Sequence, residues 1–169
     1  MKQLTLIRHA KSSWKNPELT DFQRPLRKRG MRDAPRMGGI MAKKLDRPDM
    51  FLSSPARRAL DTAHLVCAAL VLDTESVVTD ERLYHAGLAD LYAVLSELED
   101  GYERIFLCAH NPGITEFVNF LTLSMIEKVP TCGVAHITLP VDNWKDIAFG
   151  VGKLVFFDCP KRHRQPESR

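Results

Sequence analysis

The sequence predicts one α/β domain in which helices cover both faces of a mostly parallel β-sheet. Two observations support this three-layer α/β/α architecture. Apolar runs of strand length alternate with stretches of helical spacing along the chain. A length of 169 residues suits one compact domain, and no repeat or linker divides the sequence before residue 160. We therefore expect a single domain over residues 1–160, followed by a basic, flexible tail over residues 161–169.

The first half of the chain opens with a buried strand over residues 3–8. A mainly helical stretch follows over residues 31–45. Within it, Pro35 predicts that the helix is kinked or starts late, because proline lacks a backbone N–H. Residues 50–53 form a short apolar strand. Pro55 then suits the first turn of a helix that runs to about residue 70.

The second half continues the alternation. Gly101 stands where a helix over residues 88–98 is expected to stop. Pro112-Gly113 opens a further helix that runs to about residue 123. The last strands follow this helix, so we expect them to form an antiparallel edge of the sheet. The strands predicted here cover residues 76–79, 104–109, 134–139 and 154–157.

The composition is that of a soluble globular protein, with 44% hydrophobic and 27% charged residues. No apolar stretch is long enough to cross a bilayer, and Arg8 interrupts the short run near the start. We therefore expect no signal peptide and a cytoplasmic location. The four cysteines are widely spaced without a CxxC pair, which favours buried free thiols over a disulfide or a metal site.

The small net charge of +3 is unevenly distributed. Basic residues gather at residues 24–29 and again at residues 161–164. These stretches are either a solvated helix start and a tail, or surfaces that attract an acidic or phosphorylated partner. Nucleic-acid binding is not expected, because no aromatic interleaving or known binding module accompanies the charges.

Polar side chains with matching chemistry follow three of the predicted strands. The first strand ends in Arg8-His9, the second runs into Ser53-Ser54-Pro55-Ala56-Arg57-Arg58, and the third ends in His110-Asn111-Pro112-Gly113. Ligands of open α/β sheets bind beyond the carboxyl ends of the strands. Arginine forks and imidazole donors that converge at this edge would suit the oxygens of a transferring phosphoryl group.

These segments resemble the histidine phosphatase superfamily, which has the phosphoglycerate mutase-like fold. The family signature after the first strand is Arg-His-Gly. This chain has Arg8-His9-Ala10, the form usual in the small branch similar to the phosphohistidine phosphatase SixA. The resemblance spans about residues 3–160. Further matching segments are Arg24-Pro25-Leu26 with Arg29-Gly30, Ser53-Ser54-Pro55 with Arg58-Ala59, Leu83-Tyr84-His85-Ala86, and His110-Asn111-Pro112-Gly113.

The resemblance implies roles for individual residues. His9 matches the nucleophile that the family phosphorylates, and His110 matches the second pocket histidine. Arg8 and Arg58 match the phosphate-binding arginines. Arg58 is preferred to Arg57 because the family arginine precedes Ala and lies four residues before Thr, so Arg57 is expected to point away. Ser12 is a further candidate contact for the phosphate.

The chemistry is consistent with these residue types. A neutral imidazole is nucleophilic when an acceptor holds one ring nitrogen and the other is free to attack. Each arginine holds phosphate oxygens in a planar fork and keeps its charge. The scheme needs no metal or cofactor, and the sequence has no carboxylate cluster or HExxH pattern that would suggest a metal site.

The sequence indicates the residue that donates a proton to the leaving group less clearly than it indicates the nucleophile and the phosphate-binding residues. Phosphoglycerate mutase relatives usually supply a carboxylic acid, and Asp80-Glu81-Arg82-Leu83-Tyr84 resembles the stretch that provides it, with Glu81 at the matching place. An alkoxide leaving group benefits from such an acid, whereas the imidazole of a phosphohistidine leaves well once protonated. Glu81 is therefore either the general acid or a solvated surface carboxylate.

The sequence thus predicts a phosphatase that acts on a protein phosphohistidine or a small phosphoester. A phosphoglycerate mutase-like phosphotransferase is an alternative, although the chain is short for the added segments that grip a bisphosphate. A phosphate- or phosphoprotein-binding module with little turnover is another. His9 speaks against that module, because binding alone would not require a nucleophile. The expected partner is a phosphorylated protein or a small phosphorylated metabolite.

Overall fold

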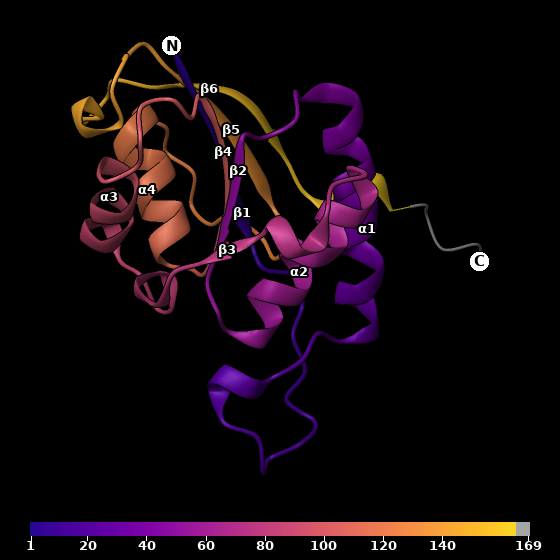
Figure 1. Ribbon diagram of the computed structural model, residues 1–169. Helices are drawn as coiled ribbons and strands as arrows, with labels where there is room; N and C mark the ends of the chain where they lie inside the picture. The colour runs from indigo at the N-terminus through magenta and orange to yellow at the C-terminus, as the bar shows by residue number, and fades with distance from the viewer. Residues whose placement is uncertain (165–169) are drawn as a thin grey trace.

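Six strands form one sheet in the order β3-β2-β4-β1-β5-β6 in the computed structural model, which describes residues 1–164 (Figure 1). The pairs among the first four strands in that order are parallel, and β5 and β6 add an antiparallel edge. The mostly parallel sheet and its late antiparallel edge are thus confirmed. The strands are β1 (Lys2–Arg8), β2 (Met50–Ser53), β3 (Val78–Thr79), β4 (Arg104–Ala109), β5 (Val134–Leu139) and β6 (Lys153–Asp158).

Two pairs of helices enclose this sheet. The helices α1 (Lys28–Lys44) and α2 (Arg57–Ala69) cover one face, and α3 (Leu88–Ser96) and α4 (Gly113–Thr122) cover the other (Figure 1). This arrangement confirms the three-layer α/β/α architecture. Parallel strands meet at the same edge of the sheet with their carboxyl ends, so the residues that follow β1, β2 and β4 are brought together there.

The central strand β4 shows why such a segment reads as a continuous apolar run. Its side chains alternate between the two faces. Ile105 and Leu107 are buried in the core under α3 and α4, whereas Phe106 and Cys108 are buried in the core under α1 and α2. Because helices cover both faces, a polar side chain anywhere between Ile105 and Cys108 would be buried away from water, so the whole strand is apolar.

The first helix departs from the prediction. It begins at Lys28, earlier than expected, and includes Pro35 in its interior. Its buried face carries Ala34, Met37 and Met41 against α2 and the sheet. Burial of this apolar face outweighs the hydrogen bond that proline cannot donate. In α2 the first residue is Arg57, so Pro55 precedes the helix instead of lying in its first turn.

The end of the described chain packs against the last strand. Pro160–His163 forms a short 3-10 helix, in which His163 Nε2 lies 2.6 Å from Asp158 Oδ2 and Arg162 donates to the carbonyl of Phe157. Residues 165–169 of the predicted tail lie outside the described residues. Within residues 1–164, no helix combines the length and the apolar character needed to span a membrane.

Candidate active site

The register between β1 and β4 places the two candidate histidines side by side. Arg8 pairs with Ala109 at the end of this parallel ladder, and the backbone N–H of His9 donates to the carbonyl of Ala109 at 3.1 Å. His9 and His110 therefore leave neighbouring strands at the same level. Their ring centroids are 5.1 Å apart, and both residues are buried.

The His9 ring is held in one tautomer. Its Nδ1 lies 2.8 Å from the carbonyl oxygen of Ala10, which can only accept, so Nδ1 carries the proton and Nε2 keeps its lone pair. Burial lowers the pKa of His9 to about 4; the Ala10 hydrogen bond opposes this shift, and the charges of Arg58, Arg8 and Arg24 reinforce it. The ring is thus neutral at pH 7 with a free lone pair.

His110 is also neutral. Burial lowers its pKa to about 3, with further contributions from the neighbouring His9 and Arg58. Its Nε2 lies 2.8 Å from Ser54 Oγ, which also accepts from the backbone N–H of Ala56. The donor in this contact is set by the ring nitrogen of His110 that carries the proton, because a serine hydroxyl can both donate and accept. Nδ1 is buried and has no partner among the described residues.

Asp21 lies between two arginines. Arg58 donates through Nη1 to the Asp21 carbonyl at 2.7 Å and through Nη2 to Oδ2 at 3.0 Å. Arg24 donates to Oδ1 at 3.0 Å, and the hydroxyl of Tyr84 donates to Oδ2 at 2.6 Å. Burial alone would raise the pKa of Asp21, but the hydrogen bonds from Tyr84, Arg24 and Arg58 hold it well below its usual range. Asp21 is therefore an anion that fixes both guanidinium groups.

Arg24 joins this cluster, although in the sequence it stands in a basic stretch and is marked only by the Arg24-Pro25-Leu26 match. It is buried, donates to the hydroxyl of Ser12 and the carbonyl of Ser13, and lies 3.3 Å from the centroid of the Trp14 ring. A guanidinium that stacks on an aromatic ring and donates hydrogen bonds to three acceptors has a fixed orientation. The Arg24 contact also fixes the Ser12 hydroxyl, which lies in the loop after His9.

Two local features hold that loop on the scaffold. The Thr62 hydroxyl accepts from the backbone N–H of Ala10 and donates to the carbonyl of Arg58, so it links the loop to α2. Gly30, in α1, lies against Lys11, and a Cβ there would collide with the Lys11 carbonyl oxygen. Only glycine permits this close approach of α1 to the loop.

Arg57 and Arg58 point in different directions, as expected from the spacing of Arg58 to Ala59 and Thr62. The Arg57 side chain is 57% exposed and pairs with Asp61 at 3.6 Å, whereas the Arg58 side chain is 5% exposed beside Asp21. Side chains of consecutive residues in an α-helix are rotated by about 100° around the helix axis, so Arg57 faces solvent while Arg58 faces the pocket.

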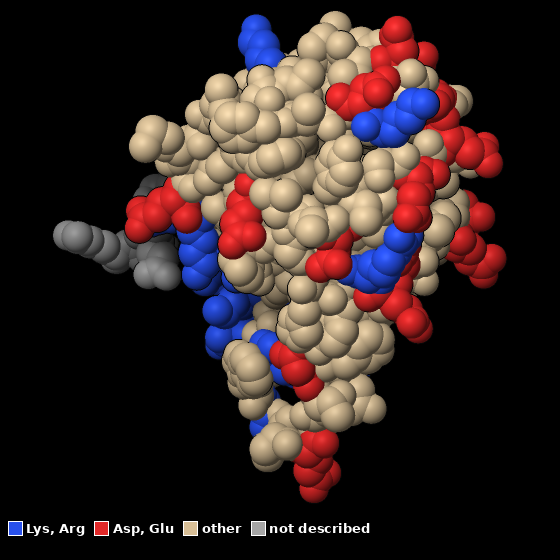
Figure 2. Space-filling model, turned by 90° about the vertical axis from the view of Figure 1, so that its left-hand side faces the viewer, with Lys and Arg blue, Asp and Glu red and all other residues tan. Residues whose placement is uncertain are grey.

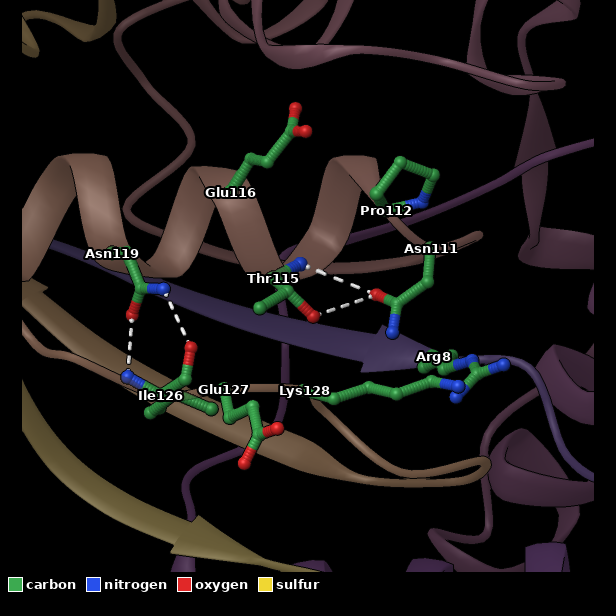
Figure 3. Close-up of a pocket in the computed structure, with 9 residues that line it drawn as sticks. All are labelled: Arg8, Asn111, Pro112, Thr115, Glu116, Asn119, Ile126, Glu127 and Lys128. Carbon is green, nitrogen blue, oxygen red and sulfur yellow. Dashed lines mark hydrogen bonds between the residues drawn. The ribbon is translucent and has the colours of Figure 1, made fainter.

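Arg8 lies on the other side of His9 and lines a cavity of about 580 Å³ (Figure 3). Its Nη1 donates to the carbonyl of Val129 at 3.0 Å, and the Asn111 side chain donates to the same oxygen. The Arg8 Nε is buried and has no partner among the described residues. Figure 3 shows the long side chain of Lys128 extending toward the Arg8 guanidinium. His9, His110 and Arg58 do not line this cavity.

Glu81 makes none of these contacts in the part of the chain that the structure describes. It begins a short 3-10 helix (Glu81–Leu83), its side chain is exposed, and it makes no side-chain hydrogen bond or ion pair with any described residue. Two residues that follow it do reach the cluster. Tyr84 bonds to Asp21, and His85 lies 3.4 Å from the same carboxylate.

Sequence reasoning thus missed Asp21, Arg24 and Tyr84 as members of the site. Asp21 and Arg24 stand three residues apart in a segment without apolar periodicity, between predicted elements. Their only signal was the Arg24-Pro25-Leu26 match to the resembling family.

The surface of the molecule is unevenly charged. On the face that carries α3 and α4, acidic side chains line one edge and basic side chains gather at the other (Figure 2).

Comparisons with known proteins agree with this geometry. An uncharacterized protein of Mycobacterium tuberculosis is 28% identical over 165 residues, which cover 92% of this chain and all of that protein. A SixA from Agrobacterium tumefaciens has the same fold, with a TM-score of 0.78 at 24% identity over 94% of this chain and 98% of that chain. The protein histidine phosphatase SixA complexed with tungstate matches with a TM-score of 0.77 at 22% identity, over 96% and 99% of the two chains.

The family model described as histidine phosphatase superfamily (branch 1) matches residues 4–111, which is well over half of the chain. The matched segment contains the two histidines, Arg8, Arg58 and the Asp21 segment. Membership supports a phosphatase activity. This chain belongs to the histidine phosphatase superfamily.

Proposed function

We propose that the protein is a metal-independent phosphatase that hydrolyses its substrate through a phosphohistidine intermediate at His9. The observation that carries this proposal is the state of the His9 ring. It is buried and neutral, its Nδ1 proton is held by the Ala10 carbonyl, and its Nε2 lone pair is free. A free lone pair on a neutral, oriented imidazole is what nucleophilic attack requires.

The reaction has two steps. In the first, His9 Nε2 attacks phosphorus, a new N–P bond forms, and the bond from phosphorus to the leaving group breaks. In the second, water attacks the phosphorus of phosphohistidine, the N–P bond breaks, and inorganic phosphate leaves. The two steps together replace one difficult displacement by two easier ones, as covalent catalysis does in general.

The phosphoryl oxygens would be bound by Arg8, Arg58 and His110. Arginines suit this task because their planar donors match two oxygens at once and keep their charge at any working pH. The buried, unpaired Nε–H of Arg8 supports it, because such a group is costly unless a ligand accepts from it. Ser12 is a further candidate, because its hydroxyl accepts from Arg24 and keeps its own proton to donate. With this much positive charge in place, the transition state needs no metal ion.

The substrate class that we favour is a protein phosphohistidine, and a small phosphorylated metabolite is the alternative. The fold shared with SixA supports the first class. The imidazole of phosphohistidine is a good leaving group once it is protonated, so a site without a carboxylic acid beside the nucleophile can release it.

Turnover by the purified protein tests this proposal. It should release inorganic phosphate from a histidine-phosphorylated protein faster than from a panel of small phosphoesters, and exhaustive chelation should leave the rate unchanged. Activity that disappears on chelation and returns with a divalent metal would refute the metal-independent mechanism. Faster turnover of a small phosphoester would reassign the substrate class.

A further inference from the structure

His85 lies beside the buried His110 and has no role in the steps above. Its ring centroid is 5.9 Å from that of His110, and its ring is tilted by 33° to the ring of Tyr84 with centroids 4.0 Å apart. Its Nε2 lies 3.4 Å from Asp21 Oδ2. The His85 side chain is 62% exposed, so it borders both the pocket and the solvent.

The segment around His85 is fixed in an unusual conformation. The backbone φ of His85 is 53°, in the left-handed region that residues with a Cβ rarely adopt. The following turn packs on the start of α4, where a side chain at Gly113 would collide with the carbonyl oxygen of Ala86. Strained backbone of this kind persists only where the surrounding structure imposes it, and it is frequent at functional sites.

Other groups beside the nucleophile are poorly suited to donate a proton at neutral pH. The hydrogen bonds that hold the pKa of Asp21 far below its usual range keep it ionised. Burial, together with the hydrogen bond to Asp21, raises the pKa of Tyr84. His110 is neutral because burial lowers its pKa to about 3. Glu81 is exposed and has no hydrogen bond or ion pair that would hold it toward the pocket.

We propose that His85 is the general acid and base of this phosphatase, with the Asp21 carboxylate facing its Nε2. This inference rests on the proposed function. In the first step the His85 imidazolium gives its proton to the leaving oxygen or nitrogen as His9 takes the phosphoryl group. In the second step neutral His85 takes a proton from the attacking water and returns to the imidazolium. No proton is gained or lost over the cycle.

The chemistry of His85 fits this exchange. Imidazole gains and loses a proton near neutral pH more readily than any other side chain. Exposure lets His85 exchange protons with water between turnovers, which the buried rings of His9 and His110 cannot do as easily.

A series of phenyl phosphates with different leaving groups provides the test. His85→Asn should slow turnover of unsubstituted phenyl phosphate by about a hundredfold, within the range for a lost general acid, and turnover of a dinitrophenyl phosphate by less than about threefold. Asparagine is chosen because it tolerates the left-handed backbone. His85→Gln is a second variant, and His64→Gln, on α2, is the matched control with unchanged rates.

The pH profile gives an independent readout. In the native protein, turnover of phenyl phosphate should lose activity at the alkaline side as the donor deprotonates, and this limb should vanish in His85→Asn. The titratable and charged groups that face His85 are Asp21, Tyr84 and His110, with Arg58 behind Asp21. None of them is removed by the substitution, so a limb that persists belongs to one of them and overturns the assignment.

Three further outcomes separate the possibilities. Equal losses on all phenyl phosphates would show that His85 only shapes the pocket. A leaving-group-dependent loss in Glu81→Gln, with His85→Asn unaffected, would assign the proton to Glu81. Failure of the native protein to form a phosphoenzyme from dinitrophenyl phosphate would instead refute the proposed function itself, and with it the His85 assignment.

Discussion

The two sides of the pocket differ in how their arginines are paired. On the Asp21 side, Arg58 and Arg24 share one carboxylate, and the Tyr84 hydroxyl bonds to the same group. On the other side, Arg8 lines a cavity of about 580 Å³, and its buried Nε has no partner among the described residues. The arginines on the Asp21 side have hydrogen-bond partners without a ligand, whereas the Nε of Arg8 on the other side has none among the described residues.

The two sides thus differ in how far their donors are held in place before a substrate binds. Groups that already have partners are fixed before a substrate arrives, so they lose little freedom when it binds. A buried N–H without an acceptor carries a desolvation cost that a ligand oxygen relieves. The Asp21 side therefore sets the orientation of the pocket, and the Arg8 side gains most from occupancy. Each of the following variants acts on one of these two sides.

The largest effect is expected when the fixed side loses its buried arginine. Arg58→Ala should lower kcat/KM by about a thousandfold, the loss typical of a preorganised donor to developing charge. Arg57→Ala is the matched control, because Arg57 is the exposed neighbour paired with Asp61. Steady-state kinetics on one substrate measures both. Similar losses at the two positions would mean that Arg58 is not the phosphate ligand.

A smaller loss is expected when the arginine stays but its acceptor changes. Asp21→Asn keeps the shape of the side chain and removes its charge, so Arg58 and Arg24 lose their common anchor. Misplacement of a catalytic group by about 1 Å costs up to about a hundredfold, and kcat should fall by that order. Asp61→Asn, which removes the partner of Arg57, should leave kcat unchanged. A higher kcat in Asp21→Asn would show that Asp21 competes with substrate for the arginines.

The pH dependence of stability reports on the same side. The folded pKa of His9 is about 4, below the value of about 6.5 for an unfolded histidine, so the unfolded chain binds more protons between these values. His9 alone should lower the free energy of unfolding by roughly 3 kcal/mol as the pH drops from above 6.5 to 4, and His110, whose folded pKa is about 3, should add a loss of similar size. Urea unfolding at several pH values measures this loss. The loss should be smaller in His9→Asn; an equal loss would contradict the burial of a neutral His9.

The smallest effect is expected on the Arg8 side. Lys128→Met removes a charge that extends toward the Arg8 guanidinium and should raise KM about threefold with kcat unchanged, since an exposed charge contributes below about 1 kcal/mol. Lys145→Met, at an exposed lysine in the 3-10 helix Trp144–Asp146, serves as the control. Salt titration of KM should show the dependence on ionic strength shrinking in Lys128→Met only.

The strands and helices were largely predictable because their apolar periods are strong and their lengths ordinary. The strand over residues 104–109 matched the structure. The wrong boundaries include those near proline and the strand predicted over residues 76–79, which covers only Val78–Thr79 after a 3-10 helix over Thr74–Ser76. A helix can keep Pro35 when burial of its apolar face outweighs one lost hydrogen bond, and no local rule measures that burial.

The site was predictable where it follows strand ends and unpredictable where it depends on a loop. Arg8, His9 and His110 stand beside paired strands, so their proximity follows from the topology. Asp21 reaches Arg58 from 37 residues away in sequence, through a segment with no regular period. Such a contact depends on tertiary packing that periodicity does not encode. The roles of Glu81 and Ser12 stay predictions.

The most direct measurement is the capture of the covalent intermediate. Rapid quench of the native protein with labelled substrate should trap an acid-labile, base-stable phosphoprotein, and peptide mapping should place the label on His9. His9→Ala should form no such species and should lose turnover. Full activity in His9→Ala, or a label on any other residue, would contradict the account.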